Sequence, residues 1–455
     1  MDDYTDFLSS KRLIVRGTGR PVDGSDINPA LFDHQRALTR WAARKGRAAV
    51  FADTGLGKTF IQVEWARLMS RCALIVAPLG VARQTVRIAR ERLGVDVRYV
   101  RDGASLSGDG LYITNYEMVS HFDPARFDAV VLDESSILKA IDGKTRARLS
   151  EMFADTAYKL CCTATPAPND IAEIGNHAEF LGVMNRVDML ATFFIHDDEG
   201  WRLKKHARQD FYRWLASWAM SVRRPSDIGY SDQGYELPPL NIEPVWIESN
   251  IHTPGALFFL GLNGIGDRIT ARRQTLDSRV EAVAKMVNAT PEQVIVWHGL
   301  NEEGKRLCAL IPDAVLVEGG QTPEVKAAAI EDFQDGRHRV LVTKPKIGGF
   351  GLNLQNATEQ YFCGLSDSFE MYYQCVRRSW RFGQTRPVNV RIVLATTEAE
   401  IWENVQRKER EAAQMSQGLI AHVAEFEREE LADAQTGDDY RPSQAMRLPA
   451  WLVAA

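Results

Sequence analysis

The stretch Ala52-Asp53-Thr54-Gly55-Leu56-Gly57-Lys58-Thr59 decides the predicted fold of this chain. The apolar run at 48–51 precedes it and is short enough for a buried strand. Apolar residues at helical spacing follow it, at positions 61, 65, 68 and 69. A glycine loop between a strand and a helix is a cradle for phosphate, because its backbone N–H groups turn toward the anion and the helix N-terminus adds its positive end. The sequence therefore predicts a nucleoside triphosphate site.

Individual residues of this loop have predicted roles in binding the nucleotide. Lys58 is expected to reach the terminal phosphates, and the Thr59 hydroxyl is expected to ligate magnesium. Thr54, Gly55 and Gly57 are expected to bind the phosphates along the backbone. An ordinary glycine-rich turn is the alternative interpretation of the loop.

The composition limits the class of protein. With 455 residues, of which 45% are hydrophobic and 25% charged, the chain matches a globular protein of about two to four domains. No apolar run reaches the length of a membrane span and the acidic N-terminus lacks an apolar signal region, so we expect a cytoplasmic protein. The net charge of −5 restricts any nucleic-acid binding to local basic patches. The six cysteines include no C-x-x-C pair, which predicts reduced thiols and no structural zinc.

Further apolar segments predict a mostly parallel sheet with helices on both faces. Each segment is short, ends in polar residues and is separated from the next by a helical stretch. The segments are residues 73–78, 111–116, 129–132 and 160–163. In such sheets ligands bind at the carboxyl ends of the strands, and Lys58 and Asp133 both fall there.

Two of these strand ends carry candidate catalytic groups. Asp133 is expected to hold the magnesium ion, and Glu134 to orient and deprotonate the water that attacks the terminal phosphate. The alternative is an Asp-Glu pair that only caps a helix. Thr163 and Thr165 are interpreted as hydroxyls that sense the phosphate site and pass its state to a second domain, or as the end of a strand before a proline turn.

The order of these motifs resembles the first RecA-like lobe of a superfamily 2 helicase, and more narrowly the Swi/Snf-type double-stranded DNA translocases and their phage-encoded relatives. The matching segments are Val76-Ala77-Pro78-Leu79, Ile113-Thr114-Asn115-Tyr116-Glu117, Leu132-Asp133-Glu134-Ser135-Ser136-Ile137-Leu138-Lys139 and Thr163-Ala164-Thr165-Pro166-Ala167-Pro168-Asn169. Ala52 fits the A-x-x-G-x-G-K-T loops that are common in this family. Leu31-Phe32-Asp33-His34-Gln35 resembles its L-x-x-H-Q element, which implies that Gln35 reads the adenine edge.

Two departures from the family pattern concern the catalytic region. Ser135-Ser136 replaces the usual Ala-His, and Ala164 replaces a glycine. The Asp-Glu pair is intact, so the resemblance still implies hydrolysis. The missing histidine leaves open how this pair is coupled to Thr163 and Thr165.

An aromatic and basic segment at 171–250 follows these motifs. Apolar residues at positions 211, 214, 215 and 218 form a stripe at helical spacing, which favours a core face over a base-stacking platform. The basic residues around it either contact phosphates or form a solvated face, and they are Arg202, Lys204, Lys205, Arg208 and Arg213.

The second half of the chain repeats the pattern of short apolar strands. They lie at 294–298, 314–318 and 340–343, and Gly348-Gly349-Phe350-Gly351-Leu352-Asn353-Leu354 follows them. The last segment resembles the G-G-x-G-x-N-L motif of the second helicase lobe, which implies contacts of Gly349 and Gly351 with the nucleotide. Pro312-Asp313 with Glu324-Val325-Lys326 is reminiscent of a nuclease pattern, but Thr322-Pro323 predicts that the latter begins a helix.

The segment Gln374-Cys375-Val376-Arg377-Arg378-Ser379-Trp380-Arg381-Phe382-Gly383-Gln384-Thr385 resembles the family motif Q-x-x-x-R-x-x-R-x-G-Q-T. Arg378 and Arg381 are three residues apart and share a helix face, so both can stabilise charge on the transferring phosphoryl group. Gln374 is expected to take part in coupling, and Arg377 has no predicted role. The alternative is a basic amphipathic helix that contacts solvent.

The predicted protein is α/β, with two tandem RecA-like P-loop domains, each a mostly parallel sheet flanked by helices. We expect an arm at 1–30, a first lobe at 31–250 with a helical insertion at about 175–240, a second lobe at 251–435 and a tail at 436–455. The resemblance implies an ATP- and Mg²⁺-dependent motor on double-stranded DNA, and we expect a phage or prophage origin from the same resemblance. A strand-separating DNA or RNA helicase and a non-motor binding protein are the alternatives.

Overall fold

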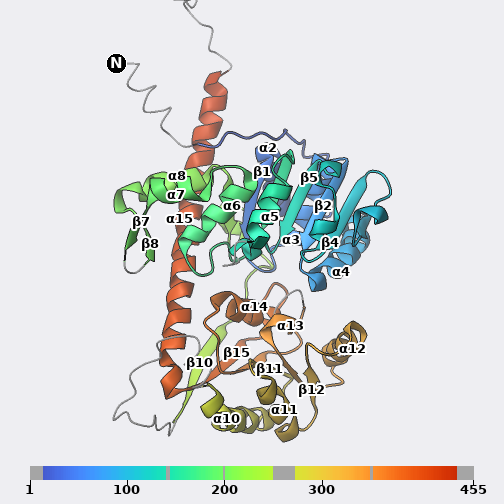
Figure 1. The fold of residues 1–455 in the computed structure, drawn as a ribbon, viewed down its shortest axis with the longest axis vertical. Coiled ribbons are helices and arrows are strands. Elements are labelled where there is room, and N and C mark those ends of the chain that lie inside the picture. Colours follow the sequence, from blue (N-terminus) through green and yellow to red (C-terminus); the bar gives the residue numbers. More distant parts are fainter. Residues whose placement is uncertain (1–13, 140–143, 198–199, 249–271, 349–351, 438–455) are drawn as a thin grey trace, which may run out of the picture.

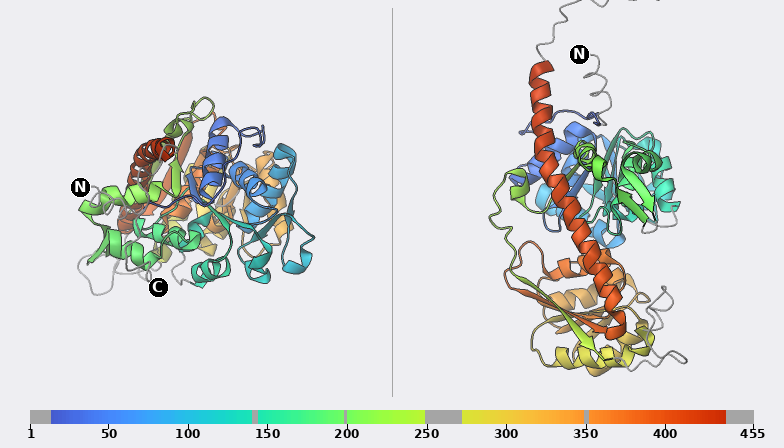
Figure 2. Two further views of the ribbon diagram at one scale, coloured as in Figure 1. Left: turned by 90° about the horizontal axis from the view of Figure 1, so that it is seen from above. Right: turned by 90° about the vertical axis from the view of Figure 1, so that its left-hand side faces the viewer.

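The computed structural model describes residues 14–139, 144–197, 200–248, 272–348 and 352–437. They form two lobes stacked along the long axis of the molecule (Figure 1). The long helix α15 (Ala399–Gly437) runs beside both lobes in two perpendicular views (Figures 1 and 2). Within these residues, no helix combines the length and the apolarity that crossing a membrane requires.

The first lobe is built on a seven-stranded sheet with the order β3-β4-β2-β5-β6-β1-β9, in which all neighbouring strands are parallel. The strands are β1 (Arg47–Ala52), β2 (Cys72–Ala77), β3 (Val97–Tyr99), β4 (Gly110–Asn115), β5 (Ala129–Asp133), β6 (Tyr158–Cys162) and β9 (Ala219–Val222). Because β5, β6 and β1 are adjacent, the residues that follow them meet at one edge of the sheet.

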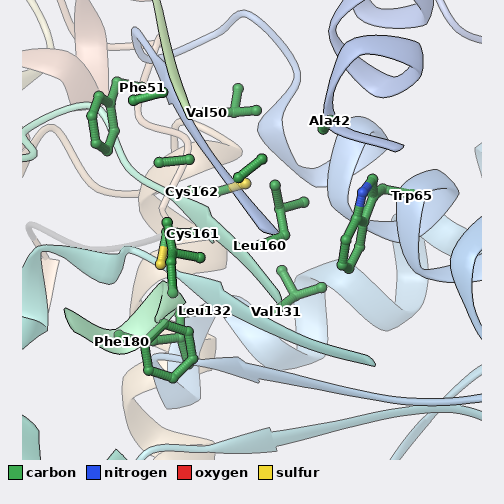
Figure 3. Packing of buried hydrophobic residues seen from close by; sticks show 14 of the residues in the cluster. Ala42, Val50, Phe51, Trp65, Val131, Leu132, Leu160, Cys161, Cys162 and Phe180 are labelled. Atoms are coloured by element: carbon green, nitrogen blue, oxygen red, sulfur yellow. The ribbon is translucent and has the colours of Figure 1, made fainter. Parts of the chain in front are cut away.

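Helices cover both faces of this sheet. They are α2 (Asp33–Lys45), α3 (Lys58–Met69), α4 (Leu79–Ile88), α5 (Lys144–Met152), α6 (Ile174–Leu181), α7 (Arg186–Phe193) and α8 (Arg208–Ala216). Successive residues of a strand point to opposite faces. Figure 3 shows this alternation, with Val131 and Leu160 toward Trp65 of α3 and Leu132 and Cys161 toward Phe180 of α6. Cys161 and Cys162 are therefore small core residues.

The second lobe contains a six-stranded sheet with the order β10-β15-β14-β11-β13-β12, again parallel throughout. Its strands are β10 (Leu240–Ile247), β11 (Val294–His298), β12 (Ala314–Val317), β13 (Val340–Thr343), β14 (Glu359–Cys363) and β15 (Val388–Ala395). Its helices are α10 (Leu276–Asn288), α11 (Asn301–Leu310), α12 (Pro323–Gln334), α13 (Pro345–Gly348) and α14 (Phe369–Ser379). The predicted α/β fold with two tandem parallel-sheet lobes is confirmed.

The lobe boundaries differ from the predicted ones at two places. Strand β10 precedes the expected boundary at 250 but pairs along its whole length with β15 of the second sheet. Helix α15 falls in the predicted second lobe, yet Met415, Leu419 and Val423 are buried in the core of the first. Both segments are only partly apolar, so their local pattern does not reveal which sheet or core they join.

The predicted helical insertion at about 175–240 contains helices, a small antiparallel hairpin and strand β9, which belongs to the seven-stranded sheet and pairs with β1. The hairpin strands are β7 (Phe194–Asp197) and β8 (Gly200–Leu203), and they lie between α7 and α8. Phe211, Trp214 and Trp218 are at most 1% exposed and pack against one another. The stripe is therefore core, as favoured, because no buried ring can stack on a base.

The remaining predicted segments lie at the edges of the structure. The described part of the N-terminal arm lies on the first lobe, where Val15 N donates to Ser217 Oγ at 3.1 Å. The tail beyond residue 437 lies outside the described residues. Glu324-Val325-Lys326 lies in the first turn of α12, which Thr322 caps by accepting from Val325 N. That helical position removes the nuclease interpretation, which requires a strand there.

Candidate nucleotide site between the lobes

The phosphate loop connects β1 to α3 at the edge of the first sheet. Gly55 and Gly57 have φ angles of 97° and 84°, which favour glycine, and a Cβ atom at Gly57 would lie 2.1 Å from Gln35 Nε2. Lys58 Nζ donates to Ala52 O at 3.0 Å, so the ammonium group lies along the loop. The half-buried Thr59 follows in the first turn of α3. The loop therefore has the backbone and the charge that a phosphate cradle requires.

Gln35 contacts the phosphate loop directly. Its Nε2 donates to Leu56 O at 3.2 Å, and its Oε1 accepts from Phe32 N at 3.1 Å. His34 lies beside it, with Nε2 3.4 Å from Leu56 O. The structure thus places Gln35 at the loop, and its role in reading adenine stays a prediction.

Asp133 and Glu134 lie at the end of β5, two strands from the phosphate loop. Asp133 Oδ1 accepts from Glu134 N at 3.0 Å, and Tyr116 donates to Asp133 O at 2.7 Å. Burial raises the pKa of Asp133 and raises the pKa of Glu134 to about 7, although the Lys58 ammonium opposes both shifts. A carboxylate with a pKa near neutrality is suited to accept a proton from water.

The backbone of Glu134 is held in a strained conformation. Its φ angle is 50°, in the left-handed region that non-glycine residues rarely occupy. Such conformations persist where the surrounding structure fixes them, and they cluster at functional sites. Here two hydrogen bonds to the preceding residue, Asp133, fix the turn that orients the Glu134 side chain.

A carboxylate and a hydroxyl suit a magnesium ion that takes its other ligands from phosphate and water. Asp133 and Thr59 provide that pair at the carboxyl end of the sheet, after β5 and β1. In the part of the chain that the structure describes, no group of three histidine, cysteine or acidic residues gathers as a metal site of its own. The residues therefore fit a metal that arrives together with a nucleotide.

The predicted coupling hydroxyls lie next to the catalytic carboxylate. Thr163 Oγ1 is 3.4 Å from Glu134 Oε2, at the distant limit of a hydrogen bond. Thr165 N donates to Thr163 Oγ1 at 3.2 Å and so orients that hydroxyl. The segment after β6 therefore contacts Glu134, and its role in coupling stays a prediction.

Helix α14 brings the predicted arginines to the same interface from the second lobe. Gln374 holds Arg378 by two hydrogen bonds, from Nε to its backbone O at 2.8 Å and from Nη2 to its Oε1 at 2.7 Å. Arg378 and Arg381 both donate to Leu352 O. Because α14 ends at Ser379, Arg381 lies beyond the helix, and the common acceptor Leu352 O brings the two guanidinium groups together in place of the predicted shared helix face. Burial, with a smaller contribution from the nearby Arg381, lowers the pKa of Arg378 to about 10, and Glu134 opposes the shift. Among the described residues neither guanidinium forms an ion pair, so both can receive phosphate oxygens.

Gly349 and Gly351 lie outside the described residues. Their implied contacts with the nucleotide stay predictions.

Ser135 and Ser136, which replace the usual Ala-His, contact one residue in each lobe. Ser135 Oγ lies 3.1 Å from Nε2 of His177 on α6, and burial lowers the pKa of this histidine to about 4. Ser136 Oγ and the Lys139 ammonium both donate to the Glu370 carboxylate of α14. The Asp-Glu segment is therefore tied to its own lobe by Ser135 and to the second lobe by Ser136.

The sequence analysis missed a second set of interlobe contacts. Arg377, which had no predicted role, donates to Asp53 of the phosphate loop at 2.5 Å. The Tyr373 hydroxyl donates to the same carboxylate. The available signal was an acidic residue in the phosphate loop together with an unassigned arginine beside the motif arginines.

The predicted basic residues of the insertion are divided between two environments. Arg202, Lys205 and Arg208 line a cleft of about 710 Å³ together with Arg407 and Lys408 of α15. Lys204 instead donates to the carbonyl oxygens of Ala191 and Thr192. Arg213 is half-buried and lies outside the cleft lining.

Comparisons with known proteins place one family match in the second lobe. Residues 278–383 match the helicase conserved C-terminal domain. The chain is 32% identical over 117 residues to "Helicase SWR1" of Mycosarcoma maydis, covering 26% of this chain and 6% of that protein. It is 29% identical over 109 residues to "ATP-dependent helicase rhp16" of Schizosaccharomyces pombe, covering 24% of this chain and 12% of that protein. The chain therefore spans a small part of the length of the curated relatives it matches.

A similar solved structure is the "Sulfolobus solfataricus SWI2/SNF2 ATPase core in complex with dsDNA". The similarity covers 87% of this chain and 96% of that chain, with 14% sequence identity and a TM-score of 0.44.

Proposed function

We propose that this chain is an ATP- and Mg²⁺-dependent motor of the Swi2/Snf2 helicase type that moves along double-stranded DNA. One observation carries the proposal. The phosphate loop and Glu134 of the first lobe share an interface with Arg378 of the second, close enough for Arg378 and Glu134 to shift each other's pKa. Hydrolysis at such a site depends on contact between the lobes, which is what a motor requires to convert chemistry into movement.

Each part of the site has a task in the proposed reaction. Lys58 and the loop amides bind the phosphates. Thr59 and Asp133 would hold magnesium, which would supply positive charge to the phosphate oxygens. Glu134 accepts the proton of the attacking water. Arg378 and Arg381 stabilise the charge on the transferring phosphoryl group. Thr163 then transmits the state of Glu134 to the segment that follows β6.

The choice of duplex DNA as the track rests on the resemblance of the motifs to Swi/Snf-type translocases and on the match of 278–383 to the helicase C-terminal domain. The basic cleft between the insertion and α15 offers cations that could neutralise backbone phosphates. A phage origin and a cytoplasmic location remain predictions from the sequence.

The test is ATP hydrolysis measured with duplex DNA, single-stranded DNA or RNA. We expect duplex DNA to stimulate hydrolysis most, and displacement of a triplex-forming strand to require ATP. Stimulation by single strands alone would instead support the strand-separating helicase. A wild-type protein that binds duplex DNA but hydrolyses no ATP with any of these nucleic acids would support the non-motor alternative.

A further inference from the structure

An ion pair crosses the lobe interface at the phosphate loop itself. Arg377 Nη2 lies 2.5 Å from Asp53 Oδ2, and their side chains are only 8% and 13% exposed. The other carboxylate oxygen, Oδ1, accepts from the Tyr373 hydroxyl and from Thr54 N, the latter at 2.6 Å. One acidic side chain of the first lobe is therefore bonded to two residues of α14 and to the backbone of its own phosphate loop.

The second lobe presents Arg377 in a fixed orientation. Its guanidinium lies 5.1 Å from the centroid of the Tyr373 ring and 4.3 Å from that of the Trp380 ring. Trp380 Nε1 in turn donates to Pro238 O at 2.7 Å. Stacking on aromatic rings removes much of the conformational freedom of a long side chain, so little further conformational entropy is lost when the ion pair forms.

The pair stands next to the arginines that the proposed reaction uses. Tyr373 and Arg377 are four residues apart and share a face of α14, and Arg378 follows immediately. Phe382 also approaches the loop, because a Cβ atom at Gly55 would lie 2.8 Å from the Phe382 Cβ. A contact that fixes Arg377 against the loop therefore also fixes how Arg378 and Arg381 meet it.

We propose that Asp53, Tyr373 and Arg377 are positioning residues, which lock α14 onto the phosphate loop so that Arg378 and Arg381 are aligned with the bound phosphates. The assignment rests on the proposed function, since it concerns the same ATP site. Asp53 is the residue of the first lobe that Tyr373 and Arg377 of α14 bind when the lobes close. Its carboxylate bonds both to the second lobe and to Thr54 N, so the loop backbone is ordered by the same contact that closes the lobes.

The kinetic test uses Arg377→Gln, Asp53→Asn and the double variant, with Arg386→Gln as a matched control. Arg386 lies in the same lobe and pairs with Glu292 at 3.4 Å, with both side chains 51% exposed. Each single variant should lower kcat for DNA-stimulated ATP hydrolysis about thirtyfold or more, because it leaves a nearly buried charge unpaired. KM for ATP should change little, and the control should match the wild type.

The double variant separates positioning from two unrelated defects. If the two residues act as one contact, the double variant loses no more activity than the worse single variant. Arg377→Lys should recover part of kcat, because it keeps the charge but loses the stacked fork. Independent, multiplicative losses, or a raised KM with unchanged kcat, would overturn the assignment.

A closure measurement tests the contact without relying on hydrolysis. Small-angle X-ray scattering of the nucleotide-free wild type should give a smaller radius of gyration than that of Arg377→Gln, and Arg386→Gln should match the wild type. An equal radius for the wild type and Arg377→Gln would overturn the assignment. If the wild type hydrolyses no ATP, the proposed function fails, while the scattering still decides whether this pair holds the lobes together.

Discussion

Replacing Glu134 by glutamine is expected to change stability and activity in opposite directions. Burial raises the pKa of Glu134 from 4.5 to about 7, and this value already includes the attraction of Lys58 and Arg378. The folded state therefore favours the protonated side chain. The contribution of the protonated Glu134 side chain to folding stability is present below the pKa of this group in the unfolded chain, and it is lost as the pH rises through about 7. At pH 8 the ionised carboxylate costs the fold at most about 3 kcal/mol, because the side chain keeps some contact with solvent.

Glutamine is neutral at every pH and can still accept from the Thr163 hydroxyl, which lies 3.4 Å from Glu134 Oε2. Glu134→Gln should therefore raise the melting temperature of the first lobe at pH 8, by about 5 to 10 °C at most, and hardly change it at pH 5. Its ATP hydrolysis should fall by a factor of about 10² to 10⁴, because the general base is lost.

The assay is thermal unfolding without nucleotide at pH 5 and pH 8, alongside steady-state ATP hydrolysis. Glu151→Gln is the matched control, since Glu151 is an exposed carboxyl of the same lobe and should change stability by less than about 0.5 kcal/mol. A lower melting temperature for Glu134→Gln at pH 8, or an equal gain at both pH values, would refute the reasoning about burial. Unchanged hydrolysis would refute the assignment of Glu134 as the base.

Three further predictions concern the loop, the pH profile and the second core. Gly57→Ala should raise KM for ATP at least about tenfold, because its Cβ atom would meet Gln35 and its φ is 84°. Gly94→Ala is the control, since its φ is 65° but open space surrounds it, and it should leave KM for ATP unchanged. Equal effects of the two substitutions on KM would contradict this reasoning. The kcat/KM for ATP should fall as the pH drops through about 7, because protonated Glu134 in the free enzyme cannot accept a proton, and a flat kcat/KM profile between pH 6 and 8 would exclude that step. Trp297→Ala should lower the free energy of unfolding by about 3–5 kcal/mol in urea titrations, since Trp297 is fully buried and bonded to Gln360, and a loss below about 1 kcal/mol would show that this core can repack.

The sequence was sufficient for the parts of the site that lie on continuous motifs. The phosphate loop and the Asp133-Glu134 pair follow from local spacing at the end of one strand or the start of one helix. The spacing of Arg378 and Arg381 predicted a shared helix face, but the helix ends at Ser379 and Arg381 lies beyond it. The two parallel sheets on which these motifs lie could also be predicted, because short apolar runs between helical stretches leave few other architectures. The structure confirms both sheets.

Contacts between distant segments could not be predicted in the same way. The pairing of Asp53 with Arg377 depends on how the lobes meet, and no local pattern encodes that orientation. The hydrogen bond from Ser136 could not be predicted either, because its partner Glu370 belongs to the other lobe. Strand β10 was assigned to the wrong side of the boundary because its alternation is weak and its partner, β15, lies almost 150 residues later in the sequence.

Helix α15 gives the two lobes a second mechanical connection. Its first turns pack in the second core through Ile401 and Val405, while Met415, Leu419 and Val423 pack in the first. The chain also crosses between the lobes at residues 229–239, before β10. A body joined to another at two separated points has fewer degrees of freedom than one on a single tether. We therefore expect the two lobes to rotate relative to one another about a line through these two connections. Helix α15, with 39 residues and a length of about 58 Å, then sets the direction of that rotation.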